Sequence, residues 1–433
     1  MSEHPAAWTE VPADTVGDAL VAAMTLGGVD HLFFTSGTEI GFYQEAIAKA
    51  RAQGRKAPRI VTVTHESAAL NAALGYAAVS GKPAATAAHV DVGTQHYGGA
   101  IHTAWRSGLP ILITAGAPPV SLPGTFKGAR DGGHLWMQDV PDQNGIVRQY
   151  MKWDHRLEYQ DNPGLVVSRA LQVARSEPTG PVYLSLPREI TLLPQSGAHF
   201  PSTDQLGIPR PAVPDPDAVA EIAERLVKAR SPVIVTAASG RNPATVPALV
   251  ALAEALGIAV VNSAWRAYLN FPMTHPLFQE QAALKEADVV VALEAHIPWI
   301  PGRNSPPQDA YVAVIDTDPV KTRIPTFEFT ADLRLTADPL LAIQALLGAV
   351  EARIKPADKS RIAARAAHWA EASKAQWAAL EREAMAQAKQ APIGREWLAW
   401  QIGLALGDNS IVLDETTSGN RINRFLRQNR PGS

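Results

Sequence analysis

The sequence contains no cysteine among its 433 residues. This absence excludes disulfide bonds, cysteine nucleophiles and metal sites built on thiolates. The chain also has no run of Lys and Arg, and its formal net charge is only -3, so no basic surface for nucleic acid is expected. No apolar stretch is long enough to cross a bilayer, and residues 1–10 lack the pattern of a secretory signal. We therefore expect a cytoplasmic protein without nucleic-acid or membrane partners.

The length of the chain exceeds what one hydrophobic core usually supports, so two or three domains are expected. Short apolar strands alternate with helical stretches, a pattern that predicts parallel sheets with right-handed crossovers. The predicted fold class is α/β, with two doubly wound parallel-sheet domains and the start of a third α/β domain. The expected boundaries are a first domain at 1–192, a middle domain at 215–350, a helical linker at 351–391 and an incomplete third domain at 392–433, which includes a strand at 411–413.

Three positions in the first domain lie directly after predicted strands. Gly37, Glu66 and Gly93 follow the predicted strands at residues 31–34, 60–64 and 84–89. Ligands of parallel α/β sheets bind at the carboxyl ends of the strands. The shared placement predicts a functional site at this edge of the sheet.

Glu66 has two readings. An acid in the first turn of a helix is favoured by the macrodipole and is often only a solvated cap. Here, however, the preceding strand is apolar apart from Thr, and the helix that follows is rich in Ala and Gly, which permits close packing. The next strand is expected to end in a glycine loop, which lets a ligand approach the backbone closely. These features favour a functional Glu66.

The expected loop at residues 89–96 carries a dense group of polar side chains, namely His89, Asp91, Gln95 and His96. They could position a carboxylate or relay protons. They could equally be structural residues with satisfied hydrogen bonds, as histidines near strand ends often are. The sequence leaves both interpretations open.

An ordered set of motifs resembles the thiamine diphosphate enzymes, in the branch of acetolactate synthase, benzoylformate decarboxylase and pyruvate decarboxylase. The motifs are residues 65–77, 81–83, 92–94, 110–116, 180–187, 229–233 and 315–319. The resemblance covers nearly the whole chain. It is specific for the superfamily and says little about the substrate.

This resemblance implies thiamine diphosphate as cofactor, bound through Gly37, Glu66 and Gly93. Glu66 would be the catalytic residue, because a carboxylate bonded to the aminopyrimidine ring starts the proton relay that activates the thiazolium carbon. It also implies substrate contacts from Thr38, His89, Asp91, Gln95 and His96. Relatives commonly have asparagine where His96 stands, so an atypical substrate pocket is expected.

The chain contains no Gly-Asp-Gly motif, with which the family holds Mg²⁺ and the diphosphate. Residues 407–409 read Gly-Asp-Asn, but they precede the strand expected at 411–413 instead of following one. No set of oxygen ligands suited to Mg²⁺ is expected on this chain. We therefore expect a small partner subunit that carries the motif, in an α2β2 or larger hetero-oligomer. The alternative is that the sequence is a fragment.

Three further segments remain ambiguous. The 130–153 segment resembles an acetolactate-synthase-like subgroup, and its Trp136 and Gln138 could line the site, although a subunit interface is favoured. Asp316 and Asp318 look like a metal pair, but a strand-end Asp followed by Pro more often forms a turn or cap. The middle domain lacks the three-glycine dinucleotide pattern, and the sequence does not decide whether it binds FAD, ADP or nothing.

The sequence thus predicts the large subunit of a split thiamine diphosphate-dependent lyase or carboligase. The predicted substrate is a 2-oxo acid or a 2-hydroxy carbonyl compound. The alternative enzyme is a benzoylformate-like 2-oxo acid decarboxylase. The alternative from another class is a regulatory or scaffolding subunit without catalytic activity, against which the retained Glu66 argues.

Overall fold

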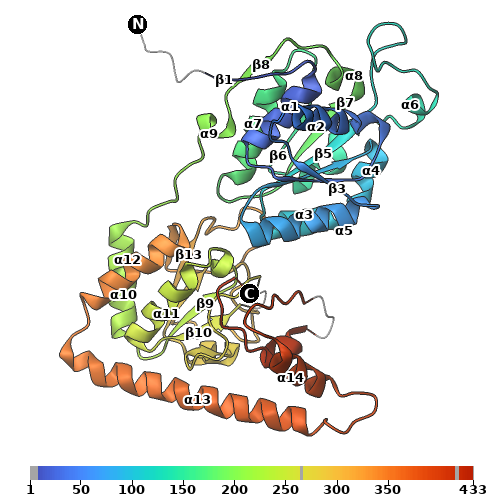
Figure 1. Ribbon diagram of the computed structural model, residues 1–433. Helices are drawn as coiled ribbons and strands as arrows, with labels where there is room; N and C mark the ends of the chain where they lie inside the picture. The colour runs from blue at the N-terminus through green and yellow to red at the C-terminus, as the bar shows by residue number, and fades with distance from the viewer. Residues whose placement is uncertain (1–7, 264–266, 415–418, 433) are drawn as a thin grey trace, which may run out of the picture. The chain divides into compact units, whose positions relative to one another are not determined.

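The computed structural model describes residues 8–263, 267–414 and 419–432. The chain divides into two compact units, Met1–Arg210 and Pro211–Ser433 (Figure 1). Each unit is built on a parallel sheet of six strands. The predicted α/β class is therefore confirmed.

The sheet of the N-terminal unit has the strand order β3-β2-β4-β5-β7-β6. Its strands are β2 (His31–Phe34), β3 (Arg59–Thr62), β4 (Ala84–Ala88), β5 (Ile111–Ala117), β6 (Trp153–Arg156) and β7 (Val182–Pro187). All five neighbouring pairs are parallel. Every residue of β4 and β5 is buried, as expected for central strands whose two faces are both covered.

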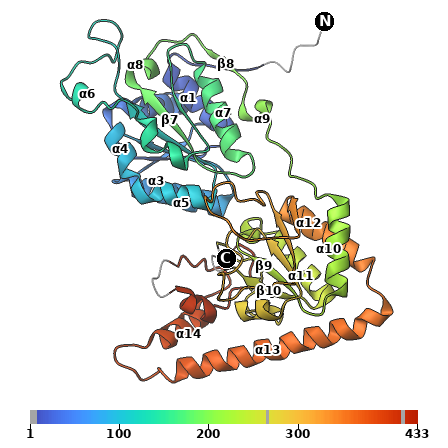
Figure 2. The ribbon, with the colours of Figure 1, turned by 180° about the vertical axis from the view of Figure 1, so that it is seen from behind.

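Helices cover both faces of this sheet (Figures 1 and 2). The helices are α1 (Val16–Leu26), α2 (Phe42–Ala52), α3 (Glu66–Ser80), α4 (Asp91–His96), α5 (Gly98–Ser107), α6 (His134–Met137), α7 (Pro163–Arg175), α8 (Arg188–Thr191) and α9 (Thr203–Leu206). Helices α1, α2 and α7 share one hydrophobic core with the sheet, and α3 and α5 share another. The site-bearing helix α3 is thereby held against a rigid layer.

Sequence reasoning missed one edge strand of this sheet and a small antiparallel pair. Strand β6 lies at the outer edge of the sheet, beside β7, where no strand was predicted. Its sequence, Trp-Asp-His-Arg, shows no apolar run because an edge strand is only partly buried. A small antiparallel pair, β1 (Thr9–Val11) with β8 (Ala198–Phe200), was likewise unpredicted. Its pairing joins residues almost two hundred positions apart.

The C-terminal unit has the strand order β11-β10-β9-β12-β13-β14. Its strands are β9 (Pro232–Thr236), β10 (Ala259–Asn262), β11 (Phe278–Gln279), β12 (Val289–Leu293), β13 (Tyr311–Asp316) and β14 (Leu333–Thr336). Its helices are α10 (Pro216–Lys228), α11 (Thr245–Leu256), α12 (Pro339–Glu351), α13 (Lys359–Met385) and α14 (Arg395–Ala405). One hydrophobic core joins this sheet with α10, α11 and α12.

The prediction of a strand at 411–413 is wrong, because these residues have no regular secondary structure. Leu413 is 94% exposed, so its apolar side chain is not part of a buried strand. The described part of the 392–433 segment instead packs α14 on α13 through Leu380, Trp400 and Phe425. Within the described residues, none of the helices is both apolar enough and long enough to span a membrane.

Candidate functional site

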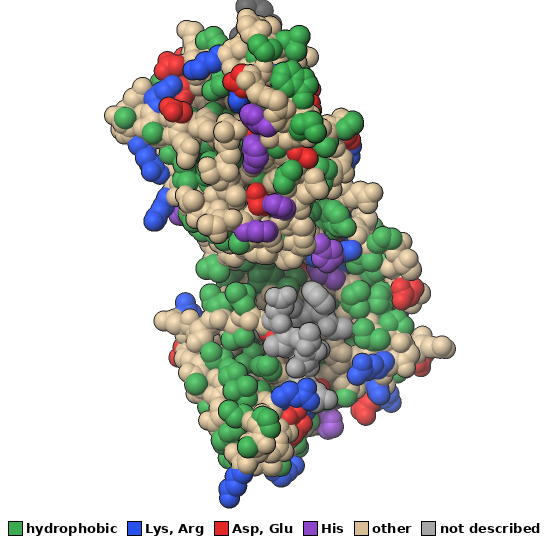
Figure 3. Space-filling view, turned by 90° about the vertical axis from the view of Figure 1, so that its right-hand side faces the viewer, with side chains coloured by type: hydrophobic (Ala, Val, Ile, Leu, Met, Phe, Trp, Pro, Cys, Tyr) green, Lys and Arg blue, Asp and Glu red, His purple; other side chains and the backbone are tan. Residues whose placement is uncertain are grey.

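Three adjacent strands of the N-terminal sheet lead into the candidate site. In the order β3-β2-β4, the strands are followed by Glu66, by Gly37 with Glu39, and by His89. The carboxyl ends of parallel strands meet at one edge, which is where such sheets bind ligands. Figure 3 shows histidine side chains gathered on one face of this unit, beside acidic side chains. The topology therefore collects acids and imidazoles at one edge.

Glu66 is the first residue of α3 and is only 7% exposed. The helix begins there because the ring of His65 caps it, with His65 Nδ1 accepting a hydrogen bond of 3.2 Å from the Ser67 N–H. The carboxylate also meets a second ring, since Glu66 Oε2 lies 3.3 Å from His96 Nδ1. A buried carboxylate at a helix start is held more firmly than a solvated cap would be. The structure therefore places Glu66 as a buried acid beside two histidines, and its functional role stays a prediction.

Gly93 permits the close approach of α4 to this carboxylate. A Cβ atom at Gly93 would lie 3.2 Å from Glu66 Oε1 and 3.0 Å from the Ala88 side chain. The expected glycine loop at 89–96 is wrong, however, because Asp91–His96 forms the short helix α4. A glycine is needed here because a side chain would crowd Glu66 and Ala88. The backbone angle φ of Gly93 is one that any residue can adopt, so backbone strain is not the reason.

A second buried acid, which sequence reasoning missed, lies beside His89. Glu39 is 1% exposed, and its Oε2 lies 2.6 Å from His89 Nδ1, as an ion pair without the alignment of a regular hydrogen bond. The Thr38 hydroxyl donates to Glu39 Oε2 at 2.8 Å, and the Gln138 amide donates to Oε1 at 2.9 Å. The only signal available in the sequence was an acid two residues after the predicted glycine turn.

The Glu39–His89 pair changes the protonation of both groups. Burial alone would raise the pKa of Glu39, but the contacts from His89 and Thr38 together hold that pKa below its usual value. The Glu39 carboxylate raises the pKa of His89 above its usual value, and burial offsets only part of this effect. His89 therefore carries its proton to a higher pH than a free histidine.

Two glycines create the space for this pair. A Cβ atom at Gly37 would lie 2.7 Å from the Cβ and Nδ1 atoms of His89. A Cβ atom at Gly116, at the end of β5, would lie 2.5 Å from Glu39 Cβ. In this structure Gly37 thus makes room for His89, a role that the sequence did not suggest.

The structure sorts the other predicted substrate residues. Thr38 belongs with Glu39 and His89, and His96 belongs with Glu66. Asp91 and Gln95 instead face each other along α4, with Gln95 Nε2 donating to Asp91 Oδ2 at 3.4 Å. The expected group of four side chains in one loop is therefore divided among three places.

The long 121–150 connection supplies part of the site. Gln138 reaches Glu39, as described above, which agrees with the weaker of the two interpretations of this segment. Trp136 is 48% exposed and lies under the guanidinium of Arg130, 5.4 Å from its carbon atom. The exposed Trp136 remains available for the alternative role in an interface, which nothing in this chain tests.

Asp316 and Asp318 form a turn, as the sequence favoured. Asp316 Oδ1 accepts a hydrogen bond from the Asp318 N–H, and its other oxygen pairs with the buried Lys321. Asp318 caps the following turn by accepting from the backbone and hydroxyl of Thr322. These contacts use the carboxylates for structure.

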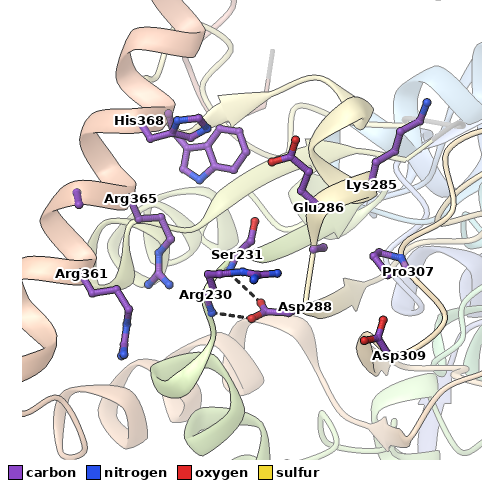
Figure 4. Close-up of a pocket in the computed structure, with 13 residues that line it drawn as sticks. Arg230, Ser231, Lys285, Glu286, Asp288, Pro307, Asp309, Arg361, Arg365 and His368 are labelled. Atoms are coloured by element: carbon purple, nitrogen blue, oxygen red, sulfur yellow. Dashed lines mark hydrogen bonds between the residues drawn. The ribbon is translucent and has the colours of Figure 1, made fainter.

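A cavity of about 620 Å³ lies in the C-terminal unit (Figure 4). It is lined by Ser231 and Asp288, which directly precede β9 and β12, so it opens at the amino ends of these strands. Asp288 already accepts hydrogen bonds from the backbone of Arg230 and Ser231 (Figure 4), and the buried Arg365 donates to main-chain carbonyls. Its buried charges thus have structural partners, and the opposite edge of a parallel sheet is the usual ligand site.

Two parts of this chain match domains of one enzyme family. Residues 14–146 match "Thiamine pyrophosphate enzyme, N-terminal TPP binding domain", and residues 219–346 match "Thiamine pyrophosphate enzyme, central domain". Together the two ranges take in more than half of the chain. Glu66, Gly93 and His89 all fall within the first range.

Curated relatives carry several activities. A benzoylformate decarboxylase from Pseudomonas aeruginosa is 29% identical over 240 residues, which are 55% of this chain and 43% of the relative. A sulfoacetaldehyde acetyltransferase from Rhodobacter capsulatus is 28% identical over 382 residues, covering 82% of this chain and 60% of the relative. The mitochondrial acetolactate synthase catalytic subunit of Saccharomyces cerevisiae is 30% identical over 127 residues, 29% of this chain and 17% of the relative. The chain thus spans about half the length of the first two relatives.

Solved structures share the fold. The thiamine diphosphate-dependent 4-hydroxybenzoylformate decarboxylase of Rhodococcus jostii matches with a TM-score of 0.69 at 19% identity, covering 97% of this chain and 74% of that chain. A thiamin diphosphate-dependent enzyme from Mycobacterium smegmatis matches with a TM-score of 0.61 at 24% identity, covering 79% and 64%. At these identities the likeness establishes the fold alone.

Proposed function

Because the chain carries the N-terminal and central domains of the thiamine pyrophosphate enzyme family, we propose that it is the large subunit of a split thiamine diphosphate-dependent lyase or carboligase. In this proposal the substrate is a 2-oxo acid or a 2-hydroxy carbonyl compound. The observation that carries it is the buried Glu66 carboxylate at a strand end, with Gly93 packed against it. This arrangement suits an aminopyrimidine ring, which needs a carboxylate partner and close approach.

In this proposal the residues around Glu66 and those around His89 have different roles. Glu66 would hold a proton shared with the aminopyrimidine, while Gly93 would keep α4 close to this carboxylate and Gly37 would leave room for His89. When bound, the cofactor supplies the nucleophilic carbon and takes up electrons as a carbon–carbon bond breaks or forms. His89, whose pKa the Glu39 carboxylate raises, would donate a proton to the substrate oxygen, and Thr38 and His96 would orient the substrate. Asp91 and Gln95, which share a hydrogen bond along α4, would support this helix.

We extend the proposal to the partner that completes the site. The 433 residues contain no Gly-Asp-Gly motif, so Mg²⁺ and the diphosphate would be held by a second, smaller chain in an α2β2 or larger assembly. FAD or ADP in the central domain is a separate expectation. A flavin would be visible in the absorption spectrum of the purified chain.

The alternative enzyme is a 2-oxo acid decarboxylase of the benzoylformate type. One observation favours it: the Glu39 carboxylate raises the pKa of His89, which suits a proton donor that would protonate the product carbon after the loss of carbon dioxide. Assays with 2-oxo acids, with and without an acceptor aldehyde, separate the two activities. Carbon dioxide release without ligation would favour the decarboxylase.

The test of cofactor binding is calorimetry with thiamine diphosphate and Mg²⁺. It is made on this chain alone and on mixtures with candidate small subunits. We expect thiamine diphosphate to bind to a mixture that contains the correct small subunit and not to this chain alone. Tight binding to this chain alone would contradict the split site, and no binding in any mixture would favour the scaffolding alternative.

The test of mechanism is the Glu66→Gln variant in the reconstituted enzyme. It should lower kcat by about 10²-fold or more while leaving the melting temperature unchanged, because general acid–base groups contribute this much. Glu45→Gln, an exposed change on α2, is the matched control and should retain full activity. Near-normal turnover of Glu66→Gln would rule out the proposed role.

A further inference from the structure

Glu66 and His96, to which the proposed function gives roles, also belong to a second arrangement together with His65. His65, Glu66 and His96 each offer one ligand atom, and these atoms lie within 4.8 Å of one another. Glu66 is buried at the base, and both histidines are exposed above it. Their rings stack with centroids 5.5 Å apart and an angle of 19° between their planes. The group therefore faces solvent with two imidazoles and one carboxylate.

We propose that this His65–Glu66–His96 cluster binds a divalent transition-metal ion, with Zn²⁺ as the type ion. Two imidazole nitrogens and one carboxylate oxygen form a common protein donor set for zinc, with a fourth position left for water. Mg²⁺ prefers an octahedron of oxygen ligands, so this cluster does not suit it. The sequence predicted no metal ligand on this chain because the two histidines are thirty-one positions apart and meet only in the fold.

The distances require only a small closure. Zinc bonds of about 2.0–2.1 Å place neighbouring ligand atoms of a tetrahedron about 3.3 Å apart. Glu66 Oε2 and His96 Nδ1 already lie 3.3 Å apart. The His65 ligand atom lies within 4.8 Å of the other two. Ligation through Nε2 leaves the 3.2 Å contact between Nδ1 and the Ser67 N–H in place, whereas ligation through Nδ1 exchanges that contact for the metal. The His65 side chain is exposed, so its ring can rotate toward the metal without displacing buried side chains.

The buried acid supplies the fixed point of the site. A Cβ atom at Gly93 would lie 3.2 Å from Glu66 Oε1, so α4 leaves this carboxylate little room on that side. A metal bound there would also occupy the carboxylate that the cofactor needs. That consequence, mutual exclusion of metal and cofactor, rests on the proposed function, whereas the metal site itself does not.

The test is a Co²⁺ titration of the full chain, without any affinity tag and without thiamine diphosphate, followed by absorption spectroscopy. We expect one equivalent of Co²⁺ to produce the intense visible bands of a four-coordinate ion, and Zn²⁺ to displace it. His96→Asn and Glu66→Gln should each weaken binding by about tenfold or more, because each removes one of three ligands. His102→Asn, an exposed change on α5 outside the cluster, should bind like the parent chain.

His65→Asn separates ligation from helix capping, because asparagine also caps helices well. It should weaken Co²⁺ binding while leaving the melting temperature of the metal-free chain unchanged. Equal affinities of the parent chain and His96→Asn would overturn the proposal, as would only the weak spectrum of six-coordinate Co²⁺. Since no cofactor is present, failure of the thiamine diphosphate proposal would leave this result unaffected.

Discussion

At the scale of single residues, Glu39 and His89 show how a charged pair can be stable inside a sheet edge. Glu39 is buried and His89 is partly buried, so each would lose hydration without the other. Their contact at 2.6 Å, with support from Thr38 and Gln138, compensates for that loss. Removal of one partner should leave the other charge uncompensated.

Glu39→Gln should therefore lower the free energy of unfolding by about 2 kcal/mol, mainly in mildly acid solution. The lowered pKa of Glu39 adds stability above its usual value of 4.5, which is lost as the pH falls through the lowered pKa. The raised pKa of His89 adds stability that is complete below 6.5 and is lost as the pH rises through the raised pKa. The difference between parent and variant should thus be largest between pH 4.5 and 6.5.

Urea unfolding at several pH values measures this difference. Glu45→Gln on the exposed face of α2 is the matched control, and it should unfold like the parent chain at every pH. A difference for Glu39→Gln that stays constant from pH 5 to about pH 9 would show that the pair does not titrate as its pKa shifts require.

At the scale of elements, the short helix α4 decides where Gly93 and His96 lie. A helix of six residues gains little stability from its own hydrogen bonds, so it depends on tertiary anchors. Its anchor is Thr94, which is fully buried and whose Oγ1 lies 2.8 Å from the Tyr183 hydroxyl on β7. The hydroxyl also bonds to the Val90 carbonyl.

Thr94→Val keeps the shape of this side chain and removes its hydroxyl. It should cost about 1–2 kcal/mol of stability, because the Tyr183 hydroxyl loses a buried partner. Amide exchange across α4 should accelerate at the same time, since the helix loses its anchor. Thr103→Val, at an exposed position of α5, is the control. Unchanged exchange in Thr94→Val would show that α4 is held by other contacts.

At the scale of the whole molecule, each unit has its own hydrophobic core. The two cores of the N-terminal unit draw only on residues up to Phe200, and the main core of the C-terminal unit draws on Val219–Trp369. A chain of residues 1–210 should therefore fold alone with one cooperative thermal transition. Circular dichroism with heating would measure it. A spectrum of an unfolded chain would mean that this core needs the rest of the protein.

The sequence by itself determined the local order of strands and helices, the parallel α/β class and the position of Glu66. These features follow from apolar periodicity, glycine breaks and motifs that are short in sequence. The edge strand β6 was missed, because its four residues are only partly buried and show no apolar run. The strand expected at 411–413 failed for the opposite reason, because a short apolar run there is exposed instead of buried.

Only the tertiary structure decided which side chains meet. His96 reaches Glu66 across thirty positions because β3, β2 and β4 are neighbours in the sheet, and Gln138, in the connection after β5, reaches Glu39 across ninety-nine. The order of strands in a sheet is set by long-range packing and is not encoded in any local pattern. The buried Glu39–His89 pair and the His65–Glu66–His96 cluster are products of that order.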